Sequence, residues 1–146
     1  MVGCIYRSGT PTTAISNDEN LHTMIRKSSE LAGYHSKIIA GDFNLNKISW
    51  DPDPITPDNL SPDSPEIKFV DCIRDSFLHQ HVTEPTRFRS GNRQTLDDLI
   101  FSTDENDIED ITYNPSMGLS GHIALQCKLK TKLKTVGSNR TTCPKV

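Results

Sequence analysis

The sequence is short of apolar residues. Only 34% of its 146 residues are hydrophobic and 6% are aromatic, whereas apolar residues usually make up nearly half of a self-contained globular chain. This deficit predicts a polar tail, a long loop or a missing partner segment. The sequence also has neither a transmembrane run nor a signal peptide, so we expect an intracellular protein without a membrane partner.

An overall positive charge is absent as well. The formal net charge is −3, which excludes a general basic field for holding nucleic acid. A DNA contact would therefore need a local patch, and the concentrated basic residues before the tail are Arg87, Arg89 and Arg93, around a predicted hairpin tip. Such a patch can contact a phosphate backbone or form a solvated turn, and the sequence favours neither.

Closely spaced cysteines are absent too. The chain has four cysteines but no Cys-x-x-Cys pair, which argues against a zinc site and against a disulfide framework. Cys4, Cys72 and Cys127 each stand among apolar residues. We expect them to be small buried side chains in a reducing compartment.

Two helices are predicted from their start signals. Ser16 and Glu19 have the spacing of a capping box, followed by apolar residues at helical intervals. His22 falls off that apolar face, so we expect it in solvent. A second helix is expected where Ser64 is a suitable N-cap and Pro65 takes the first helical position.

Strands are expected on either side of these helices. A long irregular loop over residues 45–65 and a polar, Lys-rich tail over residues 131–146 complete the chain. Alternating elements early and strands late predict a mixed α/β layered fold with helices on one face of a sheet. The expected strands are Val2–Tyr6, Lys37–Ala40, Thr95–Ser102, Ile108–Tyr113 and Ile123–Leu129.

The stretch Gly41-Asp42-Phe43-Asn44 is the first candidate for chemistry. We expect Gly41 to end the preceding strand, which places Asp42 and Asn44 at the lip of a sheet, where α/β proteins keep their ligands. Oxygen ligands of this kind suit Mg²⁺. On these four residues alone, an ordinary turn is the better interpretation.

A pair of aspartates forms the second candidate. Asp97 and Asp98 directly precede the apolar run Leu-Ile-Phe. A carboxylate that is buried beside such a run without a partner costs free energy. Neighbours in a strand face opposite ways. We therefore expect one of the two to point into a site and the other into solvent.

Five motifs in order resemble one known family. The sequence is similar to the C-terminal part of an endonuclease/exonuclease/phosphatase domain, in particular the apurinic-type endonuclease that precedes a reverse transcriptase in non-LTR retrotransposons. The resemblance implies a partial domain over residues 1–130, forming the C-terminal portion of a four-layered α/β sandwich of α+β type, with a mixed sheet and two main helices. It also implies DNA as a partner and a reverse transcriptase downstream. The motifs are Ile5-Tyr6-Arg7-Ser8, Gly41-Asp42-Phe43-Asn44, Pro85-Thr86-Arg87, Leu96-Asp97-Asp98-Leu99-Ile100-Phe101 and Ser120-Gly121-His122.

The resemblance also implies roles for single residues. Asp42 corresponds to the aspartate that orients or activates the attacking water, and Asn44 to its partner at the phosphate or the water. His122 corresponds to the histidine that binds the scissile phosphate. Asp98 corresponds to the aspartate that pairs with this histidine, and we choose it over Asp97 because the apolar run follows it directly.

The resemblance further places Tyr6 and Arg87 along the substrate. It implies Mg²⁺ or Mn²⁺ as cofactor, near Asp42 but only for a complete domain, because nothing in this chain matches the family's metal-ligating glutamate. Gly121 stands where the family has a carboxylate, in Ser-Asp-His. We therefore expect a fragment of a DNA endonuclease that is inactive alone and, by its substrate, nuclear. The alternatives are a non-catalytic binding module and a phosphoesterase for a small substrate.

Overall fold

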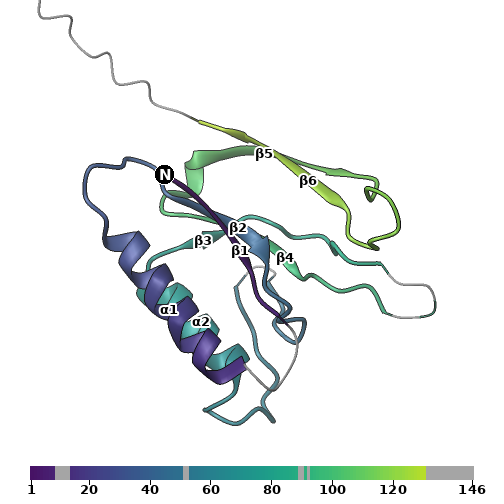
Figure 1. Ribbon diagram of the computed structural model, residues 1–146, viewed down its shortest axis with the longest axis horizontal. Coiled ribbons are helices and arrows are strands. Elements are labelled where there is room, and N and C mark those ends of the chain that lie inside the picture. Colours follow the sequence, from purple (N-terminus) through teal and green to yellow (C-terminus); the bar gives the residue numbers. More distant parts are fainter. Residues whose placement is uncertain (9–13, 51–52, 89–90, 92, 131–146) are drawn as a thin grey trace, which may run out of the picture.

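The protein has three layers (Figure 1). The structure is a computed structural model that describes residues 1–8, 14–50, 53–88, 91 and 93–130. Two helices cover one face of a four-stranded sheet, and a two-stranded sheet lies against the other face. This arrangement confirms the predicted mixed α/β fold with two main helices. The elements are β1 (Val2–Tyr6), α1 (Ala14–Glu30), β2 (Ile38–Asp42), α2 (Pro65–Asp75), β3 (His79–Gln80), β4 (Asp98–Ser102), a 3-10 turn (Glu105–Asp107), β5 (Ile108–Asn114) and β6 (Ala124–Leu129).

The order of strands in the larger sheet is β1-β2-β4-β3. Strand β1 is parallel to β2, and β4 is antiparallel to β2. The register therefore aligns Tyr6, Asp42 and Asp98 across three neighbouring strands at one end of the sheet. Residues opposite each other in a sheet point to the same face, so the backbone alone brings these three side chains together.

The main core lies between the helices and this sheet. Phe43, Phe69 and Phe101 are fully buried, and Trp50 is 6% exposed. The rings of Phe43 and Phe69 have centroids 5.2 Å apart, and those of Phe43 and Phe101 are 5.5 Å apart in an edge-to-face arrangement, which aromatic pairs prefer. Trp50 belongs to the long loop, so the loop is packed onto the core at its start.

A second apolar cluster separates the two sheets. Ile38, Val82 and Ile100 are buried there, and half-buried side chains of β5 and β6, such as Ile111 and Leu125, pack against them. Successive residues of a strand alternate between faces. Residues 38 and 40 of β2 thus face the smaller sheet, and so does Asp42, two positions further on.

Helix α2 begins as predicted, but α1 does not. Ser64 caps α2 by accepting a hydrogen bond from the Ile67 backbone N–H, with Pro65 as the first helical residue. Helix α1 starts at Ala14, so Ser16 lies inside the helix and the predicted capping box is wrong. Because the boundaries of helices shift easily by one or two residues, a Ser-x-x-Glu pattern alone does not fix the first turn.

Gly41 continues strand β2 instead of ending it. The strand runs to Asp42, and Gly41 is paired with Ile5 of β1. A Cβ atom on Gly41 would lie 1.8 Å from the Ile5 carbonyl oxygen. The glycine is therefore needed because the two backbones approach too closely for any side chain, and the expectation of a strand break is corrected.

Three further expectations about burial are wrong. His22 is 8% exposed and lies beside Phe69 with ring centroids 6.1 Å apart, whereas it was expected in solvent. Cys4 is exposed although Cys72 is buried. Asp97 is 1% exposed, so neither member of the aspartate pair is a plain solvent-facing residue. In each case the environment comes from residues that are distant in sequence.

The burial of His22 predicts an acid-sensitive fold. Burial lowers the pKa of His22, and the nearby Asp18 only partly opposes this effect. The unfolded chain then takes up a proton near pH 6.5 that the folded chain does not, so stability is full above that pH and falls as the pH drops below it. One such group changes the unfolding free energy by at most about 1.4 kcal/mol per pH unit.

We expect His22→Leu to flatten this dependence. Urea unfolding at pH 7.5 and 5.5 should show a smaller loss of stability in the variant than in the parent, with His81, whose pKa burial also lowers, supplying the remainder. Substitution of the exposed His35 is the control and should leave the loss unchanged. An equal loss in parent and His22→Leu would contradict the assignment.

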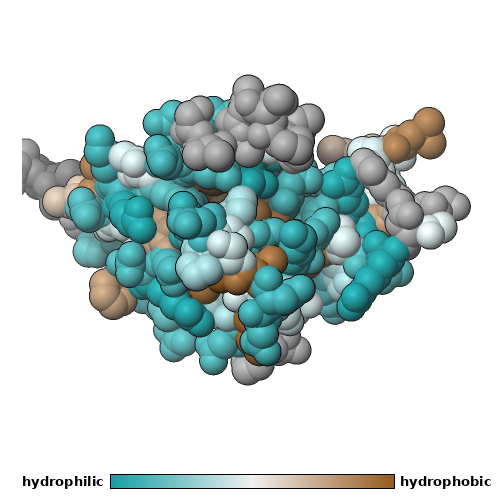
Figure 2. Space-filling view, turned by 90° about the horizontal axis from the view of Figure 1, so that it is seen from below, coloured by the Kyte–Doolittle hydropathy of each residue, from teal (hydrophilic) through white to brown (hydrophobic). Residues whose placement is uncertain are grey.

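The outer surface over the helices is mostly hydrophilic, with small apolar areas between polar side chains (Figure 2). Apart from Pro65, the first residue of α2, the described part of the predicted irregular loop contains no helix or strand, but Ser49 and Ile55 form an isolated bridge across it. Among the described helices, none has the length and apolarity to cross a bilayer. Residues 131–146, predicted as a tail, and Arg89 of the predicted basic patch lie outside the described residues.

Candidate active site

One open cavity of about 520 Å³ collects the side chains that the sequence singled out. It lies at the end of the larger sheet where Tyr6, Asp42 and Asp98 are aligned. All six predicted site residues line it, and two serines that were not predicted join them. The lining residues are Tyr6, Ser8, Asp42, Asn44, Arg87, Asp98, Ser120 and His122.

His122 is held against Asp98. Its Nδ1 atom lies 2.8 Å from Asp98 Oδ2, and its Nε2 atom lies 4.0 Å from Asp42 Oδ2. The chain enters this position through a turn in which the His122 backbone N–H donates to Ser120 Oγ. Gly121 has a left-handed φ of 75° in that turn, a conformation that glycine adopts without strain.

Asp42 is partly buried between its neighbours. Burial raises the pKa of Asp42, the Asp98 carboxylate raises it further, and His122 opposes both. One oxygen, Oδ1, accepts a hydrogen bond from the Asn44 backbone N–H at 3.2 Å. The other, Oδ2, is the atom that faces His122. A carboxylate with a raised pKa is a better proton acceptor than an ordinary surface aspartate.

Asn44 has its side-chain amide fixed from two sides. Its Nδ2 atom donates to the Arg7 backbone oxygen at 2.8 Å, and its Oδ1 atom accepts from Arg87 Nη1 at 3.1 Å. Its backbone has a left-handed φ of 49°, which asparagine tolerates better than most residues. One N–H of the Asn44 amide is therefore bonded to Arg7, and Asn44 is one of the residues that line the cavity.

Arg87 holds the site together from inside instead of forming a solvent-facing patch. Its Nη1 atom also lies 3.0 Å from Asp97 Oδ2. This pairing explains why Asp97 can be buried, since a buried carboxylate needs a partner. Asp98, in contrast, contacts His122, so the two neighbouring aspartates have different partners and both belong to the site region.

Thr86 is a site-supporting residue that sequence reasoning missed. It is fully buried, and its hydroxyl oxygen accepts hydrogen bonds from the backbone N–H groups of Asp97 and Asp98. Its backbone oxygen accepts from the Ile123 N–H, next to His122. The Pro-Thr-Arg motif thus ties the aspartate strand to the histidine strand, and only its arginine had been assigned a place.

Asp42, Asp98 and His122 form a group that can hold a metal ion. One ligand atom from each lies within 4.8 Å of the others, and the described residues contain no other such group. Mg²⁺ prefers oxygen ligands and is commonly held by one or two carboxylates, with waters and substrate phosphates completing its shell. The donor set fits that pattern through Asp42 and Asp98, without a glutamate.

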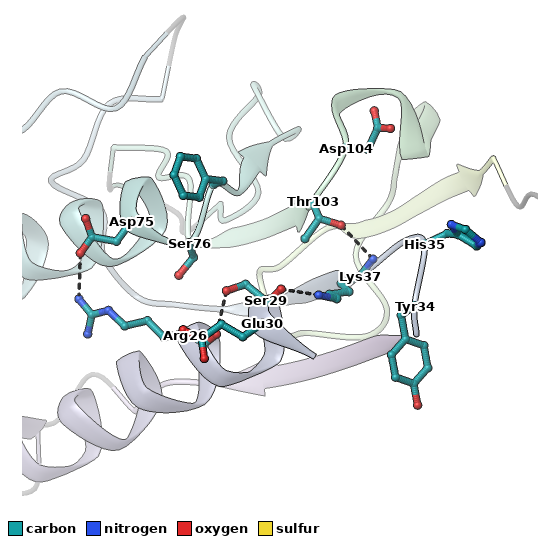
Figure 3. A pocket seen from close by; sticks show the side chains of 11 residues that line it. Arg26, Ser29, Glu30, Tyr34, His35, Lys37, Asp75, Ser76, Thr103 and Asp104 are labelled. Atoms are coloured by element: carbon teal, nitrogen blue, oxygen red, sulfur yellow. Dashed lines mark hydrogen bonds and ion pairs between the residues drawn. The ribbon is translucent and has the colours of Figure 1, made fainter. Parts of the chain in front are cut away.

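A larger cavity, of about 670 Å³, lies at the opposite end of β2 and β4. Its side chains include Arg26, Ser29, Lys37 and Asp75 (Figure 3). Several of them are already engaged with one another, as in the Lys37 ammonium with the Ser29 backbone oxygen and Arg26 with Asp75. No predicted site residue lines this larger cavity, whereas all six line the smaller one.

Comparison with known proteins gives a family match. A family model described as endonuclease-reverse transcriptase matches residues 1–126, which confirms the resemblance drawn from the sequence motifs. Neither the curated proteins nor the solved structures contain a match.

Proposed function

Because this chain belongs to the endonuclease-reverse transcriptase family, we propose that its cavity is the phosphodiester-hydrolysing part of a Mg²⁺-dependent DNA endonuclease site. The observation that carries this proposal is the alignment of Asp42 and Asp98 on neighbouring strands with His122 beside them. Two carboxylates and an imidazole thereby meet in one open cavity, and these are groups that can accept a proton, bind a phosphate and hold a metal ion.

Each side chain has a task in this proposal. Asp42, which lines the cavity beside His122, orients the attacking water and accepts its proton. His122 donates a hydrogen bond to a non-bridging phosphate oxygen or, when protonated, stabilises the charge on that oxygen. Asp98 orients the imidazole ring through its contact with Nδ1. The second N–H of the Asn44 amide orients the phosphate or the water. As the bond from water oxygen to phosphorus forms, the bond to the leaving oxygen breaks.

Asp42, with Asp98 beside it, would hold the Mg²⁺ or Mn²⁺ ion. When bound, such an ion neutralises phosphate charge and lowers the pKa of a water molecule. The described residues provide no glutamate at this position, and Gly121 contributes no carboxylate. We therefore propose that the chain alone binds the ion weakly and does not nick supercoiled plasmid in Mg²⁺.

A non-catalytic role in DNA binding is the second candidate, and Gly121 is the observation that favours it. In that case the chain binds DNA but hydrolyses no phosphodiester under any metal condition. A small phosphorylated substrate would instead be revealed by hydrolysis of a phosphomonoester. A DNA substrate is the ground for proposing a nuclear location, and the family is the ground for proposing a reverse transcriptase in the complete element.

Gly121→Asp tests the proposal by adding the missing carboxylate. The assay is hydrolysis of bis(p-nitrophenyl) phosphate in Mn²⁺, because an activated leaving group needs little assistance. We expect a slow rate for the parent chain and an increase of about tenfold in the variant, as expected for a group that tunes a metal site.

The control for this variant is Gly118→Asp. Gly118 lies in the same turn with a similar left-handed φ of 70°, and nothing lies within 4 Å of a Cβ atom built there. Both variants thus carry a similar backbone cost and the same added charge, but only one places the carboxylate next to His122. Equal rates in the two variants would count against the proposed site.

A further inference from the structure

A buried ion pair lies directly behind the site and takes no part in the chemistry above. Arg7 Nε lies 2.7 Å from Asp18 Oδ1, and Arg7 Nη2 lies 2.9 Å from Asp18 Oδ2. The side chains are only 10% and 12% exposed. This two-bond geometry fixes the guanidinium plane and joins the end of β1 to helix α1.

Arg7 also contacts the chain that leaves strand β2 in four places. Its Nη1 atom donates to the backbone oxygens of Phe43 and Asn44, at 3.4 Å each. Its backbone N–H donates to the Asp42 oxygen at 2.8 Å, and its backbone oxygen accepts from Asn44 Nδ2. A single residue thus contacts the segment that carries Asp42 and Asn44 through side chain and backbone alike.

The contacted segment needs such support. Asn44 has a left-handed φ of 49°, a conformation that persists in a non-glycine residue when its surroundings hold it. Arg7 Nη1 donates hydrogen bonds to two carbonyl groups, and these belong to the residues on either side of the Phe43–Asn44 peptide bond. The Asn44 N–H, in turn, positions Asp42 Oδ1, so a shift of this peptide would move the proposed proton acceptor.

We propose that the Arg7–Asp18 pair is a positioning device for the site, which sets the place of Asn44 and Asp42 through the two carbonyl contacts. The proposal rests on the proposed function of that same site. Asp18 orients the guanidinium, and Nη1 of that guanidinium orients the peptide. Neither residue lines the cavity of the site.

A variant pair separates positioning from plain stabilisation. Arg7→Met alone leaves a buried Asp18 carboxylate without its partner and should lower the unfolding midpoint. The double variant Arg7→Met/Asp18→Leu replaces the ion pair with apolar side chains, a change that often restores stability. It cannot restore hydrogen bonds to the Phe43 and Asn44 carbonyls.

The matched control is the ion pair between Arg26 and Asp75. It is also an Arg–Asp contact made by α1, at 3.3 Å, but its side chains are 46% and 63% exposed and it lies at the other end of the sheet (Figure 3). Exposed pairs contribute little to stability. Arg26→Met should therefore change neither the stability nor the site.

Two readouts decide the proposal. Mn²⁺ affinity, from water proton relaxation, should be about tenfold weaker in the double variant than in the parent, by analogy with outer-sphere partners of metal ligands, at a similar unfolding midpoint. Recovery of Mn²⁺ affinity together with stability in the double variant would show that the pair is only structural and would overturn the positioning role.

The second readout is independent of metal binding. The Asn44 side-chain amide should exchange slowly with solvent in the parent and in Arg26→Met, and quickly in the double variant. If the parent binds no Mn²⁺ at Asp42, the proposed function fails, and the exchange rates still test the pair. Unchanged exchange in the double variant would refute the positioning role whether or not metal binds.

Discussion

Replacing His122 with alanine should reduce Mn²⁺-supported hydrolysis of bis(p-nitrophenyl) phosphate by about 10²–10³-fold, the usual cost of losing one preorganised group that stabilises charge in the transition state. The fold should be retained, because His122 is held mainly by backbone contacts. Its neighbours Gly121 and Ile123 pair with Phe88 and Thr86 through backbone hydrogen bonds.

Two further variants test whether the loss of rate is specific to His122 and its partner. Asp98→Asn keeps a polar partner for the imidazole but removes one of the two carboxylates of the proposed metal site, so its rate should also fall. His79→Ala changes an exposed histidine in β3 and should leave the rate unchanged. A His122→Ala rate within twofold of the parent would remove the histidine from the mechanism.

Replacing Gly41 with alanine should unfold most of the chain. The added Cβ would lie 1.8, 2.7 and 2.9 Å from the Ile5 oxygen, carbon and nitrogen, and these are backbone atoms that cannot turn away. Relief requires the separation of β1 from β2, and with it the loss of the alignment that places Tyr6 beside Asp42. We expect a cost above about 4 kcal/mol, in the range of exceptional single substitutions.

Gly3→Ala is the matched control, since Gly3 lies in β1 and pairs with the same strand. A Cβ atom there would find only the Ile38 oxygen, at 3.9 Å, which is an ordinary contact. Urea unfolding followed by circular dichroism should therefore place Gly3→Ala within about 1 kcal/mol of the parent, as for other substitutions that break no contact. Equal stability of the two variants would contradict the close approach at Gly41.

Local sequence signals predicted the parts of the fold that depend on near neighbours. Ser64 and Pro65 marked the start of α2 because capping involves residues three apart. The candidate site residues depended instead on the order of five motifs that resemble a known family, since the Gly-Asp-Phe-Asn stretch alone favours a turn. The register that aligns Tyr6, Asp42 and Asp98 explains why these separate motifs meet in one place.

The features that sequence missed depend on distant partners. Asp97 is buried because Arg87 and Thr86 reach it from another segment, and strand alternation alone carries no such information. His22 is buried because Phe69 of the other helix lies beside it. Helix α2 ends at Asp75, and two residues later Phe77 has a left-handed φ of 51° and is 82% exposed, so its apolar character does not show where it lies.

A Mn²⁺ titration of the ¹⁵N-labelled chain, followed by paramagnetic broadening, tests the central proposal most directly because it requires no turnover. The signals of Asp42, Asp98 and His122 should broaden first, and Asp42→Asn should abolish this broadening. Asp71→Asn, at an exposed position on α2, should leave the titration unchanged. Broadening centred on another part of the chain, or the same broadening in Asp42→Asn as in the parent, would contradict a metal-assisted site at the end of this sheet.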